Sequence, residues 1–471
     1  MNDRLSRRDW MRIGAAAAAG VSAVPQVFAA PSSAIRVRVT AGAKRLAEAP
    51  PLAWRAPGAS SAEAILLDPS RAYQGILGFG GAFTDAACAN FHRLEPGARD
   101  ALLRELFGPA GLALSACRIC VGSSDYSSSV YSFDEGEPDP EMRRFSIDHD
   151  RAYILPTLAA ARAVNRDLYL LASPWSPPGW MKANGSMLGG SMRKQNFAAY
   201  ARYLAAFLEA YAAAGVPVDA LTVQNEVDTD QDGKMPACLW GQEYEIGFIA
   251  NHLGPELAAR KLATKIWLLD HNYNLWGRAV AELDDPKVNR YVDGVAWHGY
   301  VGDASAMTRV HEAYPEKHAY WTEGGSDFSD PRYLTNWTHW GATFAGILRN
   351  WARTIMVWNL ALDERGKPNI GPFSCGGMVT IHSETQEIQR SGLYWALAHY
   401  SRAAARGARR IASEGHVDGV SHVAFRSPSN GYSAVLTNSR AEERQLTVRM
   451  GSAEVAVALP ADSVTTLEWD S

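Results

Sequence analysis

From Ile76 onward, short apolar runs alternate with segments whose apolar residues recur at helical spacing. Short apolar runs bounded by turn residues are typical of strands buried in a parallel sheet. The runs that fit this description are Leu77–Gly80, Leu112–Val121, Leu168–Ala172, Ala220–Asn225, Lys265–Asp270, Val292–His298, Ala319–Glu323 and Thr354–Leu360. Eight strand–helix units in succession predict an α/β fold, the (β/α)8 TIM barrel.

The two ends of the chain have a different pattern. Ile35–Thr40 alternates arginine with apolar residues, and Ala64–Leu67 is a second short strand-like piece, with an Ala- and Pro-rich predicted loop between them. From about Arg409 the chain is predicted to be all β, with strands at Val420–Arg426, Tyr432–Asn438, Gln445–Met450, Ala453–Leu459 and Ser463–Trp469. These pieces predict an accompanying β-sandwich domain formed from N- and C-terminal strands.

Residues 1–30 have the features of an export signal. The run Ser6–Met11 (SRRDWM) precedes an Ala-rich apolar run from Ile13 to Val24, and small residues follow at Ala29 and Ala30. This order is typical of a twin-arginine signal, whereas the apolar run is shorter than the roughly 20 residues of a membrane-spanning helix. We therefore expect the twin-arginine translocase as a partner during export, a periplasmic or secreted protein, and no stable membrane span.

Four segments follow from these patterns. Residues 1–30 are the predicted signal, 31–72 the N-terminal strands that join the sandwich, 73–405 the barrel and 406–471 the C-terminal sandwich.

Composition narrows the function. The 471 residues carry a formal charge of −4, without the basic excess of nucleic-acid-binding proteins, so no nucleic acid partner is expected. The 15 tryptophans suit sugar binding, because flat rings stack on the apolar faces of sugars, although core tryptophans give the same count. Cys117 and Cys120 have a metal-like spacing, but residues three apart in a strand point to opposite faces. We predict that both are core residues, and we expect neither a metal nor a cofactor.

Two of the predicted strands end in a glutamate. The stretch Leu221–Asp228 (LTVQNEVD) delivers Glu226, and Tyr320–Gly325 (YWTEGG) delivers Glu323. The C-terminal ends of barrel strands meet at one mouth, and two carboxylates there are the minimum equipment for cleaving a glycosidic bond. Other polar or aromatic residues follow strand ends and are expected at the same mouth, namely Asp125, Trp175, Asn225, His298, Tyr300 and Trp358.

Four motifs carry a resemblance to a known family. They are Gly78–Ala87 (GFGGAFTDAA), Ala172–Lys182 (ASPWSPPGWMK), the pair Asn225 and Glu226, and Trp358–Leu362 (WNLAL). In this order they resemble the retaining β-glycosidases of glycoside hydrolase family 30, which includes glucocerebrosidase-like (glucosylceramidase) and β-1,6-glucanase-like enzymes. The resemblance runs from about Gly78 to the C-terminus and implies a barrel joined to a β-sandwich.

The resemblance also implies roles. Glu226 is the expected general acid/base and Glu323 the expected nucleophile, with Arg118 supporting Glu323 in its ionised form. Asn225 is expected to hold the sugar 2-hydroxyl. The remaining substrate-binding residues that the resemblance implies are Asp125, Trp175, His298, Tyr300 and Trp358.

A double displacement follows from these roles. Glu323 attacks the anomeric carbon while Glu226 protonates the leaving oxygen, and Glu226 then activates the water that hydrolyses the glycosyl-enzyme. Ionised Glu323 is expected to raise the pKa of Glu226 until Glu323 is esterified. Retention of configuration requires carboxyl groups about 5–5.5 Å apart.

The substrate is less closely defined than the reaction. We expect a β-linked glucoside, oligosaccharide or glycolipid. The sequence departs from the human-type pattern at His298-Gly299-Tyr300 and in the aromatic-poor Asp228–Leu239 loop. These departures favour glucan over ceramide as the substrate. The alternatives are a β-xylosidase or β-fucosidase of the same family, a non-catalytic carbohydrate-binding protein on the same scaffold, and a metal-dependent hydrolase. The last is disfavoured because no cluster of His and Asp ligands is apparent in the sequence.

Overall fold

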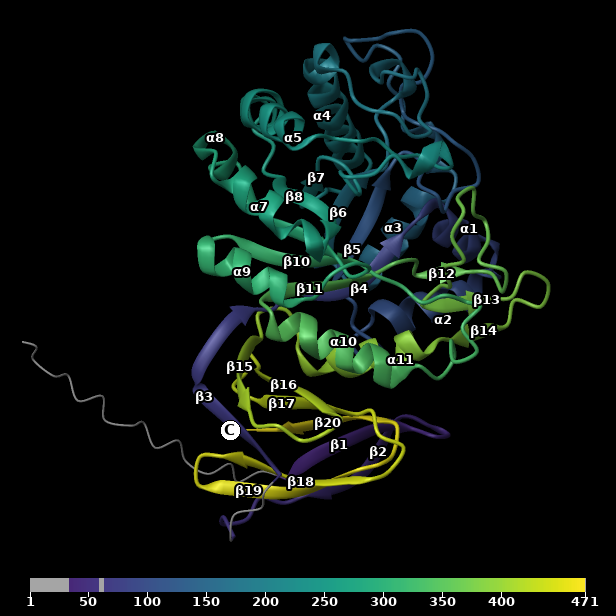
Figure 1. The fold of residues 1–471 in the computed structure, drawn as a ribbon. Helices are drawn as coiled ribbons and strands as arrows, with labels where there is room; N and C mark the ends of the chain where they lie inside the picture. The colour runs from purple at the N-terminus through teal and green to yellow at the C-terminus, as the bar shows by residue number, and fades with distance from the viewer. Residues whose placement is uncertain (1–33, 59–62, 471) are drawn as a thin grey trace, which may run out of the picture.

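A computed structural model describes residues 34–58 and 63–470. The predicted export signal at residues 1–30 lies outside the described residues. Figure 1 shows two parts, a barrel surrounded by helices and a strand-rich part in which the purple N-terminal and yellow C-terminal strands lie side by side. The structure confirms the predicted fold class.

Eight parallel strands close into a barrel in the order β10-β11-β4-β5-β6-β7-β8-β9. The strands are β4 (Gly78–Phe83), β5 (Ala116–Val121), β6 (Tyr169–Pro174), β7 (Ala220–Thr222), β8 (Lys265–Asn272), β9 (Val292–His298), β10 (His318–Glu323) and β11 (Ala352–Val357). Each predicted run therefore overlaps a barrel strand. The largest boundary difference is at β5, which begins at Ala116 rather than Leu112, and β7 ends at Thr222 rather than Asn225 because the chain turns there towards the mouth.

Helices cover the barrel and lie between it and the second sheet (Figure 1). They are α1 (Asp85–Arg93), α2 (Pro96–Phe107), α3 (Ile154–Val164), α4 (Phe197–Ala213), α5 (Gln242–Phe248), α6 (Gly254–Ala259), α7 (Trp276–Leu283), α8 (Pro286–Asn289), α9 (Ser305–Ala313), α10 (Trp337–Arg349) and α11 (Gly392–Ala403). Within the described ranges, none of them combines the length and apolar character that a bilayer crossing requires.

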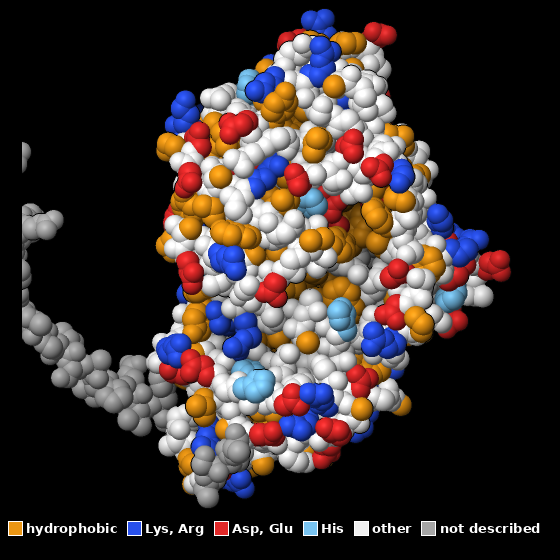
Figure 2. All heavy atoms as spheres, viewed as in Figure 1, with side chains coloured by type: hydrophobic (Ala, Val, Ile, Leu, Met, Phe, Trp, Pro, Cys, Tyr) orange, Lys and Arg blue, Asp and Glu red, His pale blue; other side chains and the backbone are white. Residues whose placement is uncertain are grey.

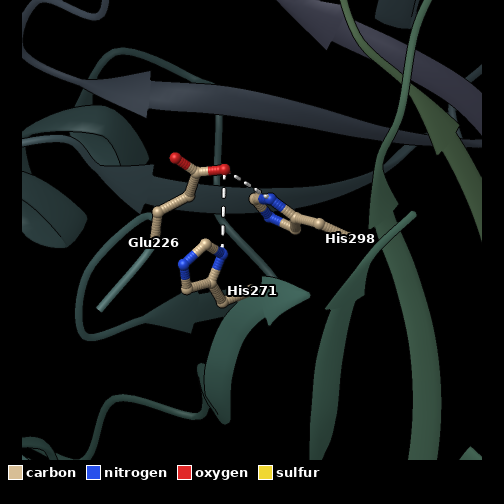
Figure 3. A group of neighbouring side chains, drawn as sticks. All are labelled: Glu226, His271 and His298. Atoms are coloured by element: carbon tan, nitrogen blue, oxygen red, sulfur yellow. Dashed lines mark hydrogen bonds and ion pairs between the residues drawn. The ribbon is translucent and has the colours of Figure 1, made fainter. Parts of the chain in front are cut away.

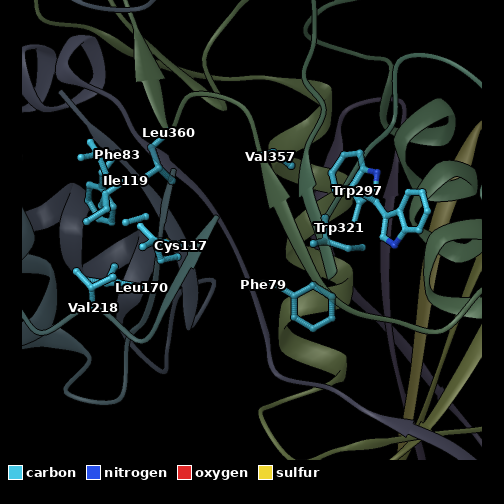
Figure 4. Packing of buried hydrophobic residues seen from close by; sticks show 14 of the residues in the cluster. Phe79, Phe83, Cys117, Ile119, Leu170, Val218, Trp297, Trp321, Val357 and Leu360 are labelled. Carbon is cyan, nitrogen blue, oxygen red and sulfur yellow. The ribbon is translucent and has the colours of Figure 1, made fainter. Parts of the chain in front are cut away.

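Alternation along the barrel strands separates two environments. On β5, Cys117 and Ile119 belong to the apolar layer between strands and helices, part of which Figure 4 shows. Ala116 points inward to the bottom layer, where the rings of Trp267 and Tyr320 stack with centroids 3.6 Å apart. The next inward position along β5 is Arg118, which is fully buried. The barrel interior therefore changes from an apolar floor to a polar layer beneath the mouth.

The cysteine pair follows the same alternation. Cys117 lies in the outer layer and Cys120 in a separate cluster at the mouth, with Trp175 and Trp358. Burial raises the pKa of Cys117 to about 12, so its thiol stays protonated. The two thiols are thus on opposite faces of one strand, as the spacing predicts.

The second sheet has nine strands in the order β19-β18-β3-β15-β16-β17-β20-β1-β2. They are β1 (Ile35–Ala41), β2 (Lys44–Leu52), β3 (Ala64–Gly75), β15 (Arg409–Glu414), β16 (Val420–Arg426), β17 (Tyr432–Asn438), β18 (Arg444–Met450), β19 (Ala453–Leu459) and β20 (Ser463–Trp469). A third, small sheet contains β12 (Ala361–Leu362), β13 (Val379–Ile381) and β14 (Ile388–Arg390).

Two strands of the second sheet differ from the sequence prediction. Lys44–Leu52 was expected to be a loop, but it is the edge strand β2, and only its pairing with β1 shows this. An edge strand tolerates proline and exposed side chains, so its sequence resembles a loop. Arg409–Glu414, which carries no predicted strand, forms β15 between β3 and β16.

Helices α10 and α11 join the two parts of the molecule. The indole of Trp337 donates to the Asp462 carbonyl at 2.8 Å, so α10 is tied to the turn before β20. On α11, the buried ring of His399 contacts Thr466 Oγ1 at 2.7 Å and Thr40 Oγ1 at 2.9 Å. His399 therefore links the barrel side of the molecule to both terminal strands.

Acid should weaken this junction through His399. Burial lowers the pKa of His399 to about 3 from 6.5. Between these values the unfolded chain binds a proton that the folded chain does not, so stability is full above pH 6.5 and is lost as the pH falls. Going from about pH 7 to about pH 5 should cost about 2 kcal/mol through this residue, measured by urea denaturation.

The variant His399→Gln keeps a hydrogen-bonding side chain that does not titrate, so its loss of stability over that pH range should be smaller by about 2 kcal/mol. His416→Gln, at an exposed histidine, is the control and should lose as much as the wild type. An unchanged pH dependence in His399→Gln would contradict the assignment.

Candidate active site

The barrel mouth holds a cavity of about 420 Å³. Figure 2 shows this half of the molecule hollowed where hydrophobic side chains surround acidic ones. The cavity is lined by Asp125, Trp175, Asn225, Glu226, Thr229, Gln231, Met235, His271, Asn272, Tyr300, Glu323, Trp358, Phe373 and Cys375. Of the predicted site residues, Arg118 and His298 are fully buried beneath this lining. The structure therefore brings the predicted residues together in one place.

Glu226 reaches the cavity through an unusual backbone conformation. Its φ is +55°, in the left-handed region, and its N–H donates to the Asp270 carbonyl at 3.0 Å. This turn allows the consecutive residues Asn225 and Glu226 both to face the cavity. Gln231 Nε2 donates to Glu226 Oε2 at 2.8 Å and holds that side of the carboxylate.

Glu323 ends β10 and faces the same cavity. One of its oxygens pairs with the Arg118 guanidinium, and the other accepts a hydrogen bond from the Tyr300 hydroxyl at 3.0 Å. Tyr300 is 47% exposed as a residue, yet its hydroxyl lies at this buried carboxylate. Arg118 Nη2 also donates to Asn225 Oδ1 at 2.7 Å. The guanidinium thus connects Glu323 with the residue beside Glu226.

Asp270 is the centre of the polar layer, and the sequence interpretation did not single it out. Its carboxylate is fully buried and contacts groups on five other strands, namely Arg118 Nη2 (2.7 Å), Ser173 Oγ (2.7 Å), Thr222 Oγ1 (2.8 Å), His298 Nε2 (3.0 Å) and Thr322 Oγ1 (2.8 Å). A signal was available, because Asp270 ends an apolar strand run in the same way as Glu226 and Glu323.

A bulge at the end of β8 brings a further residue to the cavity. The register with β9 shifts between Leu269 and His271, and Leu269 and Asp270 have φ of +73° and +50°. A bulge re-aims side chains that would otherwise alternate between faces. Asp270 therefore points into the polar layer while His271, the next residue, lines the cavity. His271 is a second site residue that strand alternation could not predict.

His298 stands between the two glutamates. Its Nδ1 lies 3.4 Å from Glu226 Oε1 and 3.8 Å from Glu323 Oε1. Burial alone would lower the pKa of His298, but Glu323, Asp270 and Glu226 outweigh burial and raise it to about 9. At neutral pH the ring is therefore an imidazolium shared by both carboxylates.

The surroundings shift the two glutamates in opposite directions. Burial acts to raise the pKa of Glu226, but His298, His271 and Gln231 outweigh burial and lower it. Burial raises the pKa of Glu323, and the Glu226 carboxylate raises it further, against the cations of His298 and Arg118. The expectation that Glu323 keeps the pKa of Glu226 raised is therefore wrong for the free site, where the histidines lower the pKa of Glu226 and burial raises that of Glu323.

The rest of the lining combines aromatic rings with a carboxylate that has one unpartnered oxygen. Trp175 and Trp358 stack with centroids 5.1 Å apart, and the Arg118 guanidinium lies over the Trp175 ring. Asp125 Oδ1 is buried and accepts no hydrogen bond within the described part of the chain. Burial raises the pKa of Asp125 well above its usual range. A buried acceptor without a partner is costly, so this oxygen is available to a hydrogen-bond donor that enters the cavity.

One group of metal-ligating atoms occurs here, against the expectation that no such cluster exists. The ligand atoms of Glu226, His271 and His298 all lie within 4.8 Å of one another. The three residues belong to different strand ends, so their proximity is created by barrel closure and is invisible in the sequence. Figure 3 shows both rings directed at one oxygen of Glu226.

Comparisons with known proteins agree with this geometry. Residues 76–404 match the family model for the "Glycosyl hydrolase family 30 TIM-barrel domain", and residues 407–467 match that for the "Glycosyl hydrolase family 30 beta sandwich domain". The chain is 32% identical to the endo-1,6-beta-D-glucanase of Neurospora crassa, over 85% of this chain and 86% of that one. It is 30% identical to putative glucosylceramidase 3 of Caenorhabditis elegans, over 86% and 82%.

A solved structure, the endo-beta1,6-glucanase BT3312, superimposes with a TM-score of 0.84 at 29% identity and covers 93% of this chain and 100% of its own. The barrel with its paired carboxylates, the accompanying sandwich and these matches together show that the chain belongs to glycosyl hydrolase family 30.

Proposed function

We propose that the protein is a retaining β-glycosidase that hydrolyses β-1,6-linked glucan or the oligosaccharides derived from it. The observation that carries the proposal is the pair Glu226 and Glu323, which face one cavity and lie 3.4 Å and 3.8 Å from the same nitrogen of His298. Two carboxylates in one sugar-sized cavity are the requirement for double displacement at an anomeric carbon. Relatives of this chain described as endo-1,6-β-D-glucanases support the choice of linkage.

Glu323 is the proposed nucleophile. Arg118 and Tyr300 direct donors at its two oxygens, which fixes the carboxylate, and the Arg118 charge acts against the rise in pKa that burial causes. Glu226 is the proposed acid/base, and Gln231 holds one of its oxygens while the other faces the cavity histidines. Asn225, held by Arg118, is placed to bind the sugar hydroxyl next to the reacting carbon.

The proton for the first step has a source in His298. Glu226 must be protonated to act as an acid, but His298 lowers the pKa of Glu226 in the free site. Transfer of the His298 proton across the 3.4 Å contact gives a neutral ring and a protonated Glu226. After glycosylation, loss of the Glu323 charge favours Glu226 as base, as the double displacement requires.

Stacked rings and the unpartnered carboxylate are proposed to hold the sugar. Trp175 and Trp358 offer an apolar wall, and Asp125 offers an acceptor for a sugar hydroxyl. Phe373, which is 44% exposed and lines the cavity, is placed to contact the departing part of the substrate. We also propose that residues 1–30 direct export by the twin-arginine translocase, so that the enzyme meets glucan in the periplasm or outside the cell.

A glycolipid is the second candidate substrate. The putative glucosylceramidase 3 of Caenorhabditis elegans is 30% identical to this chain, and the same glucoside chemistry would serve a ceramide leaving group. The two candidates share Glu226 and Glu323 and differ only in what leaves the site.

The substrate should be decided by product analysis. We expect the protein to hydrolyse a pustulan-type β-1,6-glucan faster than a laminarin-type β-1,3-glucan, glucosylceramide, or aryl β-xyloside and β-fucoside, because the relatives described as endo-1,6-β-glucanases match this chain over most of their length. Activity should survive treatment with a chelator, since neither proposed step uses a metal. Chromatography of the released sugars makes the comparison.

Proton NMR of the first-formed sugar provides the stereochemical check, with the β anomer expected from a retaining mechanism. Initial release of the α anomer would exclude Glu323 as nucleophile. Inactivity on every substrate would favour a non-catalytic carbohydrate-binding protein, and activity restored by a divalent ion would favour a metal-dependent hydrolase.

Substitution of the two glutamates should reduce activity in different ways. In Glu226→Gln the acid is lost, so kcat/KM for substrates with poor leaving groups should fall about 10²–10⁴-fold while the first step on activated aryl glucosides is spared. Glu323→Gln should lose activity on both kinds of substrate, because no nucleophile remains. Pre-steady-state release of the aryl group separates the two variants. Equal losses on activated and unactivated substrates in Glu226→Gln would contradict the assignment.

Arg118 should matter to stability as well as to activity. Arg118→Met removes the cation that pairs directly with buried Asp270 and Glu323 and leaves only His298 near both, which should cost about 3–5 kcal/mol of unfolding free energy. Arg440→Met is the matched control, because it breaks an exposed pair with Asp418 and should leave the unfolding free energy nearly unchanged. Guanidinium denaturation measures both. Similar losses in the two variants would show that the buried pair is not a structural requirement.

A further inference from the structure

We propose that Glu226, His271 and His298 form a binding site for a divalent transition-metal cation of the Zn²⁺ type, and that its occupation reversibly blocks hydrolysis. The inference rests on the proposed function for its inhibitory consequence, whereas the binding site itself rests on geometry. A carboxylate and two imidazoles form a ligand set that Zn²⁺ accepts, with a fourth position left open.

The distances suit such a cation. Glu226 Oε1 lies 3.4 Å from His298 Nδ1 and 3.7 Å from His271 Nδ1. A tetrahedral Zn²⁺ with bonds of about 2.0–2.1 Å has neighbouring ligand atoms about 3.3–3.4 Å apart. Both rings point at the same carboxylate oxygen (Figure 3). Only small side-chain movements are therefore needed to enclose a cation.

His271 gives a second, independent indication. The residue is 8% exposed, and its Nδ1 is buried without a hydrogen-bond partner in the described part of the chain. An unpartnered imidazole nitrogen directed at a carboxylate 3.7 Å away is a lone pair available to a metal.

Neighbouring residues support the other two ligands. His298 Nε2 contacts Asp270 Oδ1 at 3.0 Å, which is the carboxylate–histidine arrangement that orients metal-binding histidines and leaves Nδ1 for the metal. Gln231 Nε2 donates to Glu226 Oε2 at 2.8 Å, so that Oε1 is the oxygen that faces the two histidines. When Zn²⁺ binds, it replaces the proton on His298 Nδ1, and that proton goes to solvent.

Occupation of this site removes the proposed acid/base. Zn²⁺ on Glu226 Oε1 takes the lone pair that would carry the proton to the leaving oxygen. Zn²⁺ also displaces the proton on His298 Nδ1, so His298 can no longer supply it to Glu226. The same cation stands in the cavity that receives the sugar. Inhibition should therefore be competitive with substrate and reversed by a chelator.

The test uses the untagged full chain, stripped with a chelator. Calorimetric titration with Zn²⁺ should show one site per chain, and Co²⁺ should give the visible absorption of a low-coordinate site with nitrogen ligands. His271→Ala should weaken Zn²⁺ binding about 10–100-fold, with the isosteric His271→Gln as the replacement if that variant does not fold. His416→Ala removes an exposed histidine and should bind Zn²⁺ as the wild type does.

Binding that is unchanged in the His271 variants, or lost in His416→Ala, would overturn the proposal. The two hypotheses fail separately, since titration decides the metal site even if no glycoside is hydrolysed. A wild type that hydrolyses glucan but binds no Zn²⁺ would remove this inference alone. A protein that binds Zn²⁺ at His271 but retains full activity would overturn the inhibitory part.

Discussion

The buried ion pair between Arg118 and Asp270 is the interaction on which the active site depends. Both side chains are fully buried, and such a pair is tolerated only when every remaining donor and acceptor is satisfied. Here the two groups satisfy each other and the polar groups of neighbouring strands, including Ser173 and Thr222. The pair therefore fixes the positions of several strand ends at once. Arg118 also contacts Asn225 and Glu323, so the pair fixes these two side chains as well.

Backbone distortion is the second constraint. In a regular strand every other side chain faces the barrel interior, but in this site two consecutive residues of a strand end both face the cavity or the polar layer beneath it. Left-handed conformations at Glu226 and Asp270, and the bulge before His271, supply the extra side chains. Such conformations cost of order 1–3 kcal/mol each and persist where surrounding contacts hold them. The hydrogen bond from Glu226 N–H to the Asp270 carbonyl joins two of these positions, so each supports the other.

Much of the fold could be predicted because the barrel strands are buried on both faces and stand out as apolar runs. The edge strand Lys44–Leu52 could not, because its outer side faces solvent and its sequence carries prolines and polar residues. The predicted pocket residues, from Asp125 to Trp358, could be found because they follow strand ends or lie in recognisable motifs. Asp270 carried the same signal, but nothing in the sequence shows that its carboxylate meets five other strands.

The sequence by itself determined the fold class, the two glutamates and the family resemblance, because these depend on local patterns and on motifs that are continuous along the chain. Only the tertiary structure decided what surrounds the glutamates. Barrel closure places His271 and His298 against Glu226 from strands far apart in the chain. That proximity lowers the pKa of Glu226 in the free site and creates a set of metal-ligating atoms. Electrostatic coupling depends on distance in space, and a linear sequence does not contain that distance.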